Sequence, residues 1–114
     1  MTDGKAFEDD DEITPAALAE RIRNGSAPVL IDVREPYEWQ IARLPGARLV
    51  PLATLPEHLP SLAPDAEHVV YCHLGMRSAA AVAWLRGQGF TRVRNLTGGI
   101  ERWSLEVDPL VRRY

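Results

Sequence analysis

The chain has 114 residues, of which 46% are apolar and 25% charged, as in an ordinary soluble domain. This length predicts one domain that buries roughly two-thirds of the accessible surface of its unfolded chain, so it needs no disulfide or metal ion for stability. The sequence contains no run of ~18 apolar residues, so we expect no membrane span, and its start lacks the pattern of a secretory signal. The single cysteine, Cys72, excludes an internal disulfide and a cysteine-based zinc site, and it favours a reducing, cytoplasmic location.

The net charge of -3 is unevenly distributed along the chain. Residues 1–12 contain six acidic residues and one lysine, which gives -5, whereas residues 13–114 contain twelve arginines and ten acidic residues, which gives +2. We interpret residues 1–12 as an acidic, flexible N-terminal tail. The charge of the remainder is too weak to predict nucleic-acid binding, but it is compatible with a small anionic substrate.

The first half of the chain predicts short strands separated by helices. Thr14 is a good N-cap, and Pro15 follows it at the first position of the expected helix. Residues 28–33 form a continuous apolar run, which is typical of a strand buried on both faces. Closely spaced prolines leave room for one short helix after residue 50. The expected elements are a strand at Ile13, a helix over 15–24, a strand over 28–33, a helical turn over 36–40, a strand over 48–50 and a helix over 54–59.

The second half repeats the alternation. The expected elements are a strand over 68–71, a helix over 78–86 with Ser78 as its N-cap, a strand over 92–96 and a short helix after Gly98-Gly99. Strands spaced by helices predict an α/β domain with a mainly parallel sheet. We expect the three tryptophans, Trp39, Trp84 and Trp103, to pack in the core.

Cys72 stands where the 68–71 strand ends and a helix is about to begin. Ligands bind at the carboxyl ends of parallel strands, and the backbone N–H groups of a loop that precedes a helix bind anions and stabilise a thiolate. Gly75 allows a tight turn, and Arg77 provides a planar cation for an oxyanion. The segment predicts a nucleophilic thiolate in a pocket for a small anion. The alternative is a buried structural cysteine beside an exposed arginine.

Three ordered blocks of sequence resemble the motifs of single-domain rhodaneses. Residues 72–78 (CHLGMRS) are similar to the active-site loop of that family, and residues 30–35 (LIDVRE) with Glu38 and the following 45–47 (PGA) are similar to its first motif. Residues 95–100 (NLTGGI) with Trp103 are similar to its closing motif. We therefore take residues 13–108 as a rhodanese-like domain and residues 109–114 as a C-terminal tail.

The resemblance implies a rhodanese-like fold, a parallel five-stranded sheet with helices on both faces. It also implies that Cys72 takes sulfane sulfur from a donor such as thiosulfate, becomes a persulfide and passes the sulfur to a nucleophilic acceptor. The residues that would bind the substrate through their amides are His73, Leu74, Gly75, Met76 and Arg77. Arg77 would also orient the anionic end of the donor. Asp32, Arg34 and Ser78 are expected to support the site, the first two mainly as a structural pair.

The last part of the chain, from Trp103 to Pro109 and Tyr114, resembles the ends of rhodanese domains fused to adenylyltransferases. That similarity implies a sulfur-donor or sulfur-carrier protein as a partner, in addition to a small anionic sulfur donor. No cofactor, metal, nucleic acid or membrane is implied. The chain departs from the family at Ala42-Arg43, where Gly-His is common, and Arg43 is expected to add positive charge near the mouth of the site. We expect His73 to face solvent.

Two other functions are compatible with the same loop. A related phosphatase or arsenate reductase uses Cys-x5-Arg, but here four residues separate Cys72 from Arg77, and the shorter loop should be too tight for phosphate. A non-catalytic regulatory module would keep the fold, although degenerate members usually lose the cysteine. Rapid alkylation of Cys72 would favour catalysis over a structural role.

Overall fold

The architecture is an α/β sandwich built on one parallel sheet, as the sequence predicts. The computed structural model describes residues 11–114, so Asp3, Glu8, Asp9 and Asp10 of the expected tail lie outside the described residues. Within residues 11–114 the sheet has five strands in the order β1-β5-β4-β2-β3, all parallel. The strands are β1 (Glu12–Ile13), β2 (Val29–Asp32), β3 (Arg48–Leu49), β4 (His68–Tyr71) and β5 (Val93–Leu96).

The central strand β4 determines where the chemistry-bearing residues meet. It pairs with β2 and β5 in a register that sets Asp32 beside Tyr71 and Asn95 beside Val70. Because every strand runs in the same direction, the segments that follow β2, β4 and β5 all leave the sheet at one edge. Cys72, immediately after β4, therefore lies between the ends of β2 and β5, which are far from it in sequence.

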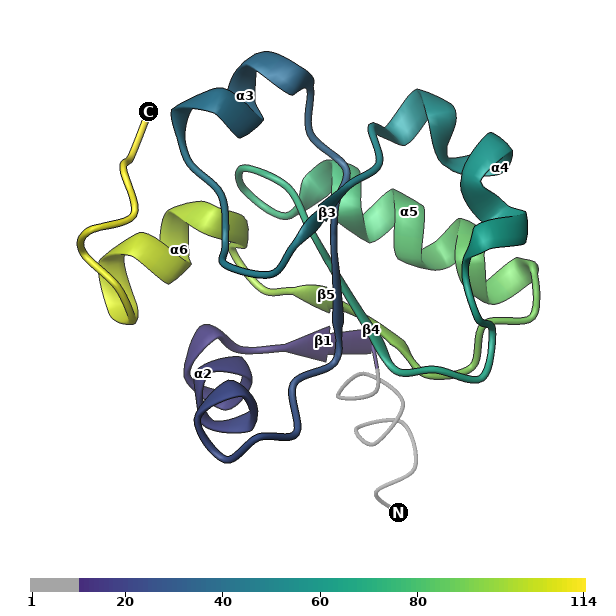
Figure 1. Ribbon diagram of the computed structural model, residues 1–114, viewed down its shortest axis with the longest axis horizontal. Helices are drawn as coiled ribbons and strands as arrows, with labels where there is room; N and C mark the ends of the chain where they lie inside the picture. The colour runs from purple at the N-terminus through teal and green to yellow at the C-terminus, as the bar shows by residue number, and fades with distance from the viewer. Residues whose placement is uncertain (1–10) are drawn as a thin grey trace.

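Helices cover both faces of the sheet. They are α2 (Pro15–Arg23), α3 (Pro36–Ile41), α4 (Leu55–His58), α5 (Met76–Gly87) and α6 (Gly99–Glu106), with 3-10 turns η1 (Leu52–Thr54) and η2 (Leu59–Ser61). One hydrophobic core joins the sheet to α4 and α5, and a second joins it to α2 and α6. Figure 1 shows these two pairs of helices on opposite sides of the sheet.

The structure moves the start of α5 and one boundary of the domain. Helix α5 begins at Met76 after Gly75, whose φ of 103° ends the loop, so Ser78 lies inside the first turn and is not the N-cap. Glu12, assigned to the tail from sequence, belongs to β1 and pairs in register with Asn95. The first difference arises because the left-handed Gly75 allows the helix to begin before Ser78, and the second because pairing with β5 draws Glu12 into the sheet.

The tryptophans are not all core residues. Trp103 is buried, and Trp84 is half-buried but packs against the core under α4 and α5, whereas Trp39 is half-buried and belongs to neither core. Trp39 lies on the short helix α3 with the Arg43 guanidinium 4.5 Å from its ring centre. No helix among residues 11–114 has the length and apolar character needed to cross a membrane.

Candidate active site

The sulfur of Cys72 is surrounded by hydrogen-bond donors from the loop that follows it. The residue is buried, and its Sγ accepts hydrogen bonds from the backbone N–H of Gly75 at 3.1 Å and of Ser78 at 3.4 Å. The Ser78 hydroxyl lies 3.2 Å from the same sulfur. Donors aimed at a sulfur stabilise its negatively charged form, so the loop suits a thiolate or a persulfide anion.

The hydroxyl of Ser78 connects the cysteine to strand β5. It lies 2.5 Å from Oδ1 of Asn95, a buried residue whose Nδ2 donates to the Gly75 carbonyl at 3.1 Å. The same Nδ2 lies 3.2 Å from the Glu12 carboxylate. Because two acceptors face Nδ2, the amide oxygen of Asn95 is turned towards Ser78. Asn95 therefore holds both the turn at Gly75 and the orientation of the serine hydroxyl.

The start of helix α6 holds the loop from the other side. Backbone N–H groups of Ile100 and Glu101 donate to the carbonyls of Cys72 at 2.9 Å and of His73 at 3.1 Å. Gly99 has φ +64°, and a Cβ there would lie 2.4 Å from the His73 carbonyl oxygen. The position requires glycine for both reasons, because the backbones approach too closely for any side chain.

The guanidinium of Arg77 is bound to a carboxylate rather than directed freely at solvent. It makes two hydrogen bonds, of 2.7 and 3.0 Å, to Glu38 on helix α3. Arg77 lowers the pKa of the Glu38 carboxyl to about 2, and Glu38 in turn raises the pKa of Arg77. The arginine side chain remains partly exposed while Glu38 is buried. An anionic donor would therefore meet Arg77 already oriented by Glu38.

Asp32 and Arg34 form a fully buried ion pair at the end of β2. The guanidinium of Arg34 donates to both carboxylate oxygens, with a shortest distance of 2.7 Å, and also to the Ala42 carbonyl at 2.6 Å. Burial opposes the charge of Arg34, but the hydrogen bonds to Asp32 and Tyr114 outweigh burial and raise its pKa. These contacts connect the end of β2 to the segment that follows α3.

Tyr114 folds back from the segment after α6 and reaches three of these residues. Its hydroxyl accepts a hydrogen bond from Arg34 at 2.7 Å and donates one to Glu38 at 2.7 Å. Its ring stacks on His73 with centroids 4.0 Å apart and planes at 13°. His73 is thus half-buried and does not face solvent as expected, because the aromatic ring covers it. Burial raises the pKa of Tyr114 to about 12.

The outer surface of the loop is apolar. Leu74 is 59% exposed and Met76 is 80% exposed, whereas Gly75 between them is buried. Exposed apolar side chains beside a nucleophile present a contact surface to an approaching molecule. Arg43, expected near the mouth of the site, has its guanidinium over the ring of Trp39.

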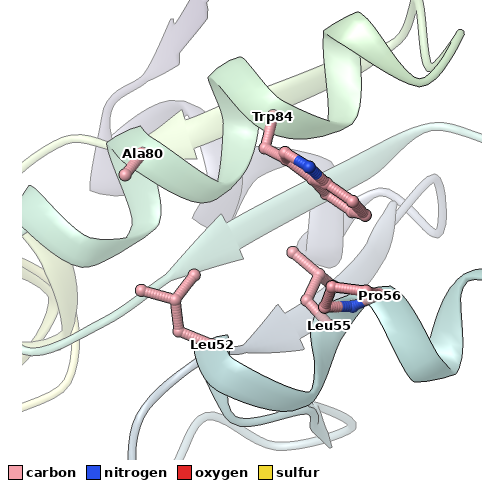
Figure 2. Close-up of a pocket in the computed structure, with 5 residues that line it drawn as sticks. All are labelled: Leu52, Leu55, Pro56, Ala80 and Trp84. Carbon is pink, nitrogen blue, oxygen red and sulfur yellow. The ribbon is translucent and has the colours of Figure 1, made fainter.

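An apolar cavity of about 240 Å³ lies apart from this chemistry. Figure 2 shows Ala80 and Trp84 of α5 facing three residues of η1 and α4 across it, and none of the loop residues 73–77 lines it. The lining residues are Leu52, Leu55, Pro56, Ala80 and Trp84. With no titratable side chain in this lining, the cavity offers no group for acid–base or nucleophilic chemistry, so the candidate site is the loop of Cys72.

The structure brings all the sequence-predicted site residues to one region and adds three. Glu38, Asn95 and Tyr114 each contact that set through side-chain hydrogen bonds. Asn95 could have been found from the sequence, since an amide inside a strand of the sheet needs partners when it is buried. Glu38 follows Arg34 closely in sequence, but nothing there indicates that it binds Arg77. Tyr114 belongs to the chain end that resembles the adenylyltransferase fusions, but nothing in the sequence indicates that it contacts the site.

The model of the rhodanese-like domain matches residues 14–106, which is most of the chain. The chain belongs to the rhodanese-like domain family. This confirms both the expected family and the expected fold. A solved structure of a rhodanese-related protein from Thermoplasma volcanium superposes with a TM-score of 0.77 at 34% identity, covering 85% of this chain and 93% of that one.

Relatives of this rhodanese-like chain include proteins of its own size and much longer ones. A protein named sulfurtransferase from Allochromatium vinosum is 35% identical over 88% of the chain and 94% of its own length. Rhodanese-like/PpiC domain-containing protein 12, chloroplastic, from Arabidopsis thaliana is 45% identical over 75% of the chain but 30% of its length. Adenylyltransferase and sulfurtransferase MOCS3-1 from Zea mays is 36% identical over 75% of the chain and 20% of its length. The chain thus spans a third or less of these two longer relatives.

Proposed function

We propose that this rhodanese-like domain is a sulfurtransferase that carries sulfane sulfur as a persulfide on Cys72. The observation that carries the proposal is the set of polar groups around Sγ: two backbone N–H donors, and the Ser78 hydroxyl, whose single proton can be given to Sγ or to Asn95. In the first step the thiolate attacks the outer sulfur of thiosulfate, an S–S bond forms to Cys72 and sulfite leaves with the electron pair of the broken bond. In the second step a nucleophile such as cyanide takes that sulfur, and the thiolate is regenerated.

The residues of the loop have separate roles in this proposal. The amides of residues 73–78 hold the negative charge of the persulfide, while Arg77, oriented by Glu38, attracts the anionic donor. The exposed Leu74 and Met76 contact whatever presents or accepts the sulfur. Relatives named sulfurtransferase support this function, and the maize relative named adenylyltransferase and sulfurtransferase supports a sulfur-carrier protein as acceptor.

A phosphatase is the weaker alternative. Cys72 and Arg77 enclose a loop one residue shorter than the phosphatase pattern. A smaller loop favours a single sulfur atom over a tetrahedral oxyanion at its centre.

Intact mass spectrometry tests the proposal directly. Wild-type protein incubated with thiosulfate should gain the mass of one sulfur atom, and cyanide should remove it with release of thiocyanate. Cys72→Ser should show neither change, because serine cannot form a persulfide. If thiosulfate leaves no adduct on the wild type, thiosulfate is not the donor. A persulfidated desulfurase would then be tested as donor in the same way. No adduct from either donor would overturn the sulfurtransferase proposal.

A further inference from the structure

One phenol connects the two charged pairs of the site. The hydroxyl of Tyr114 accepts from Arg34 and donates to Glu38, each at 2.7 Å, so it uses both of its hydrogen-bonding capacities. It therefore lies between the buried Asp32–Arg34 pair and the Glu38–Arg77 pair. The contacts span 80 and 76 residues of sequence, and Figure 1 shows the end of the chain beside α3.

The ring of Tyr114 also touches the cysteine loop itself. It stacks on His73, the residue after the cysteine, with centroids 4.0 Å apart. The loop is thus contacted directly at its second residue and, through Glu38, at its sixth residue, Arg77. A single side chain with two points of contact on one loop restricts how that loop can move.

We propose that Tyr114 is a positioning residue of the cysteine loop, which holds Arg77 through Glu38 and holds His73 by stacking. The inference rests on the proposed function, in which the loop receives an anionic sulfur donor. Without the hydroxyl, Glu38 loses the neutral donor that shares its negative charge and fixes its second oxygen. The carboxylate then keeps only Arg77 and the backbone N–H of Glu35 as partners, so more of its negative charge acts on Arg77 and the guanidinium offers less positive charge to an incoming anion.

Two alkylating reagents test this role without any sulfur transfer. Iodoacetate is an anion and iodoacetamide is neutral, so the ratio of their rates at Cys72 reports the attraction of the site for anions. Tyr114→Phe keeps the stacked ring and removes both hydrogen bonds. We expect iodoacetate to react about fivefold to tenfold more slowly, the scale of one typical net hydrogen bond, and iodoacetamide to change less than about twofold. Tyr37→Phe on α3, where the ring is 67% exposed, is the matched control and should leave both rates unchanged.

Steady-state kinetics give a second readout for an active enzyme. In a two-step transfer, kcat/KM for thiosulfate reports loading of the sulfur, and kcat/KM for cyanide reports its discharge. Tyr114→Phe should lower the thiosulfate value at least threefold more than the cyanide value. If the wild type transfers no sulfur from any donor, the proposed function fails, while the alkylation ratio still decides the role of Tyr114.

An unchanged ratio of the two alkylation rates in Tyr114→Phe would overturn the inference. An equal fall in both rates would also overturn it, because it would indicate a structural role without an effect on anion attraction. Should Tyr114→Phe not fold, Tyr114→Leu replaces it, since an uncharged aliphatic side chain can make neither hydrogen bond. Its ratio should also fall, and a wild-type ratio would contradict the proposal.

Discussion

The buried hydroxyl of Ser78 makes contacts in the structure that its place in the sequence does not predict. From sequence it is a helix cap, whereas in the structure it lies between the Cys72 sulfur and the Asn95 amide. Its single proton can be given to only one of these acceptors at a time. When Cys72 carries a negative charge, the proton of Ser78 is best directed at the sulfur.

Ser78→Ala should slow sulfur transfer about tenfold, since one hydrogen bond to a charged sulfur contributes on the order of 1.4 kcal/mol. It should also lower the free energy of unfolding by about 1–3 kcal/mol, because Oδ1 of Asn95 loses its partner in a buried place. Initial rates with thiosulfate and cyanide, together with urea unfolding, measure both effects.

The matched control for this prediction is Ser104→Ala. Ser104 is equally buried, but its hydroxyl bonds to the Ile100 carbonyl within α6 and makes no contact with the sulfur. It should leave the transfer rate within about twofold of wild type, a loss below 0.5 kcal/mol. Equal rates for Ser78→Ala and wild type would show that the two backbone donors alone support the sulfur.

At the scale of secondary structure, the turn between β5 and α6 supports the loop between β4 and α5. The first N–H groups of α6 have no partners inside their own helix, and they donate to the carbonyls of Cys72 and His73. This arrangement fixes the backbone at Cys72 and His73, while the amides of Gly75 and Ser78 donate to the sulfur. Consecutive left-handed glycines, Gly98 and Gly99, make the close approach possible.

Gly99→Ala should therefore displace the loop rather than merely strain one residue. A Cβ at 2.4 Å from the His73 carbonyl and 2.6 Å from the Cys72 carbonyl forces the two backbones apart. We expect a loss of roughly 2–4 kcal/mol in unfolding free energy and at least a tenfold loss of transfer at a temperature where the variant is folded. Thermal unfolding and the thiocyanate assay measure these changes.

The control for this prediction is Gly25→Ala, which introduces a left-handed alanine without the steric clash that a Cβ would make at Gly99. Gly25 has φ +82°, yet its Cβ would meet nothing within 4 Å. This control should lose only about 1–2 kcal/mol, the cost of a left-handed alanine, with normal sulfur transfer. If the two glycine variants behaved alike, the close approach at Gly99 would not matter for the loop.

At the scale of the whole molecule, two carboxylates paired with arginines make the free energy of unfolding depend on pH. Glu38 is held by Arg77 and Glu67 by Arg21 and Arg94, and each carboxyl has its pKa lowered to about 2. These carboxyls have a pKa near 4.5 in the unfolded chain and about 2 in the folded one. Between pH 4.5 and pH 2 the unfolded chain therefore binds more protons than the folded chain. Stability is therefore complete above that window and is lost as the pH falls through it.

Glu38→Gln should remove part of this dependence. We expect its unfolding free energy at pH 7 to be about 1–2 kcal/mol below wild type, a modest figure because Arg77 is partly exposed to solvent. The difference should shrink towards pH 2, where the wild-type carboxyl itself begins to be protonated in the folded state. Urea unfolding at several pH values between 2 and 7 measures this, with the exposed Glu57→Gln as control. A difference that stayed constant with pH would contradict the electrostatic origin.

The sequence alone determined the elements that depend on short-range chemistry. The Thr14-Pro15 helix start, the apolar run of β2 and the loop from Cys72 to Arg77 are encoded by neighbouring residues, so they were predictable. Ordered motifs then specified the family and, with it, the parallel sheet. The start of α5 was the local error, because a left-handed Gly75 competes with a good capping serine.

Only the tertiary structure decided which side chains support the cysteine. Glu38 lies 39 residues from Arg77, Asn95 lies 17 from Ser78 and Tyr114 lies 80 from Arg34. Hydrogen bonds are short and directional, so such partners depend on strand register and on where each crossover returns to the sheet. Residue type shows that a buried amide or carboxylate needs a partner, but the packed fold alone selects it.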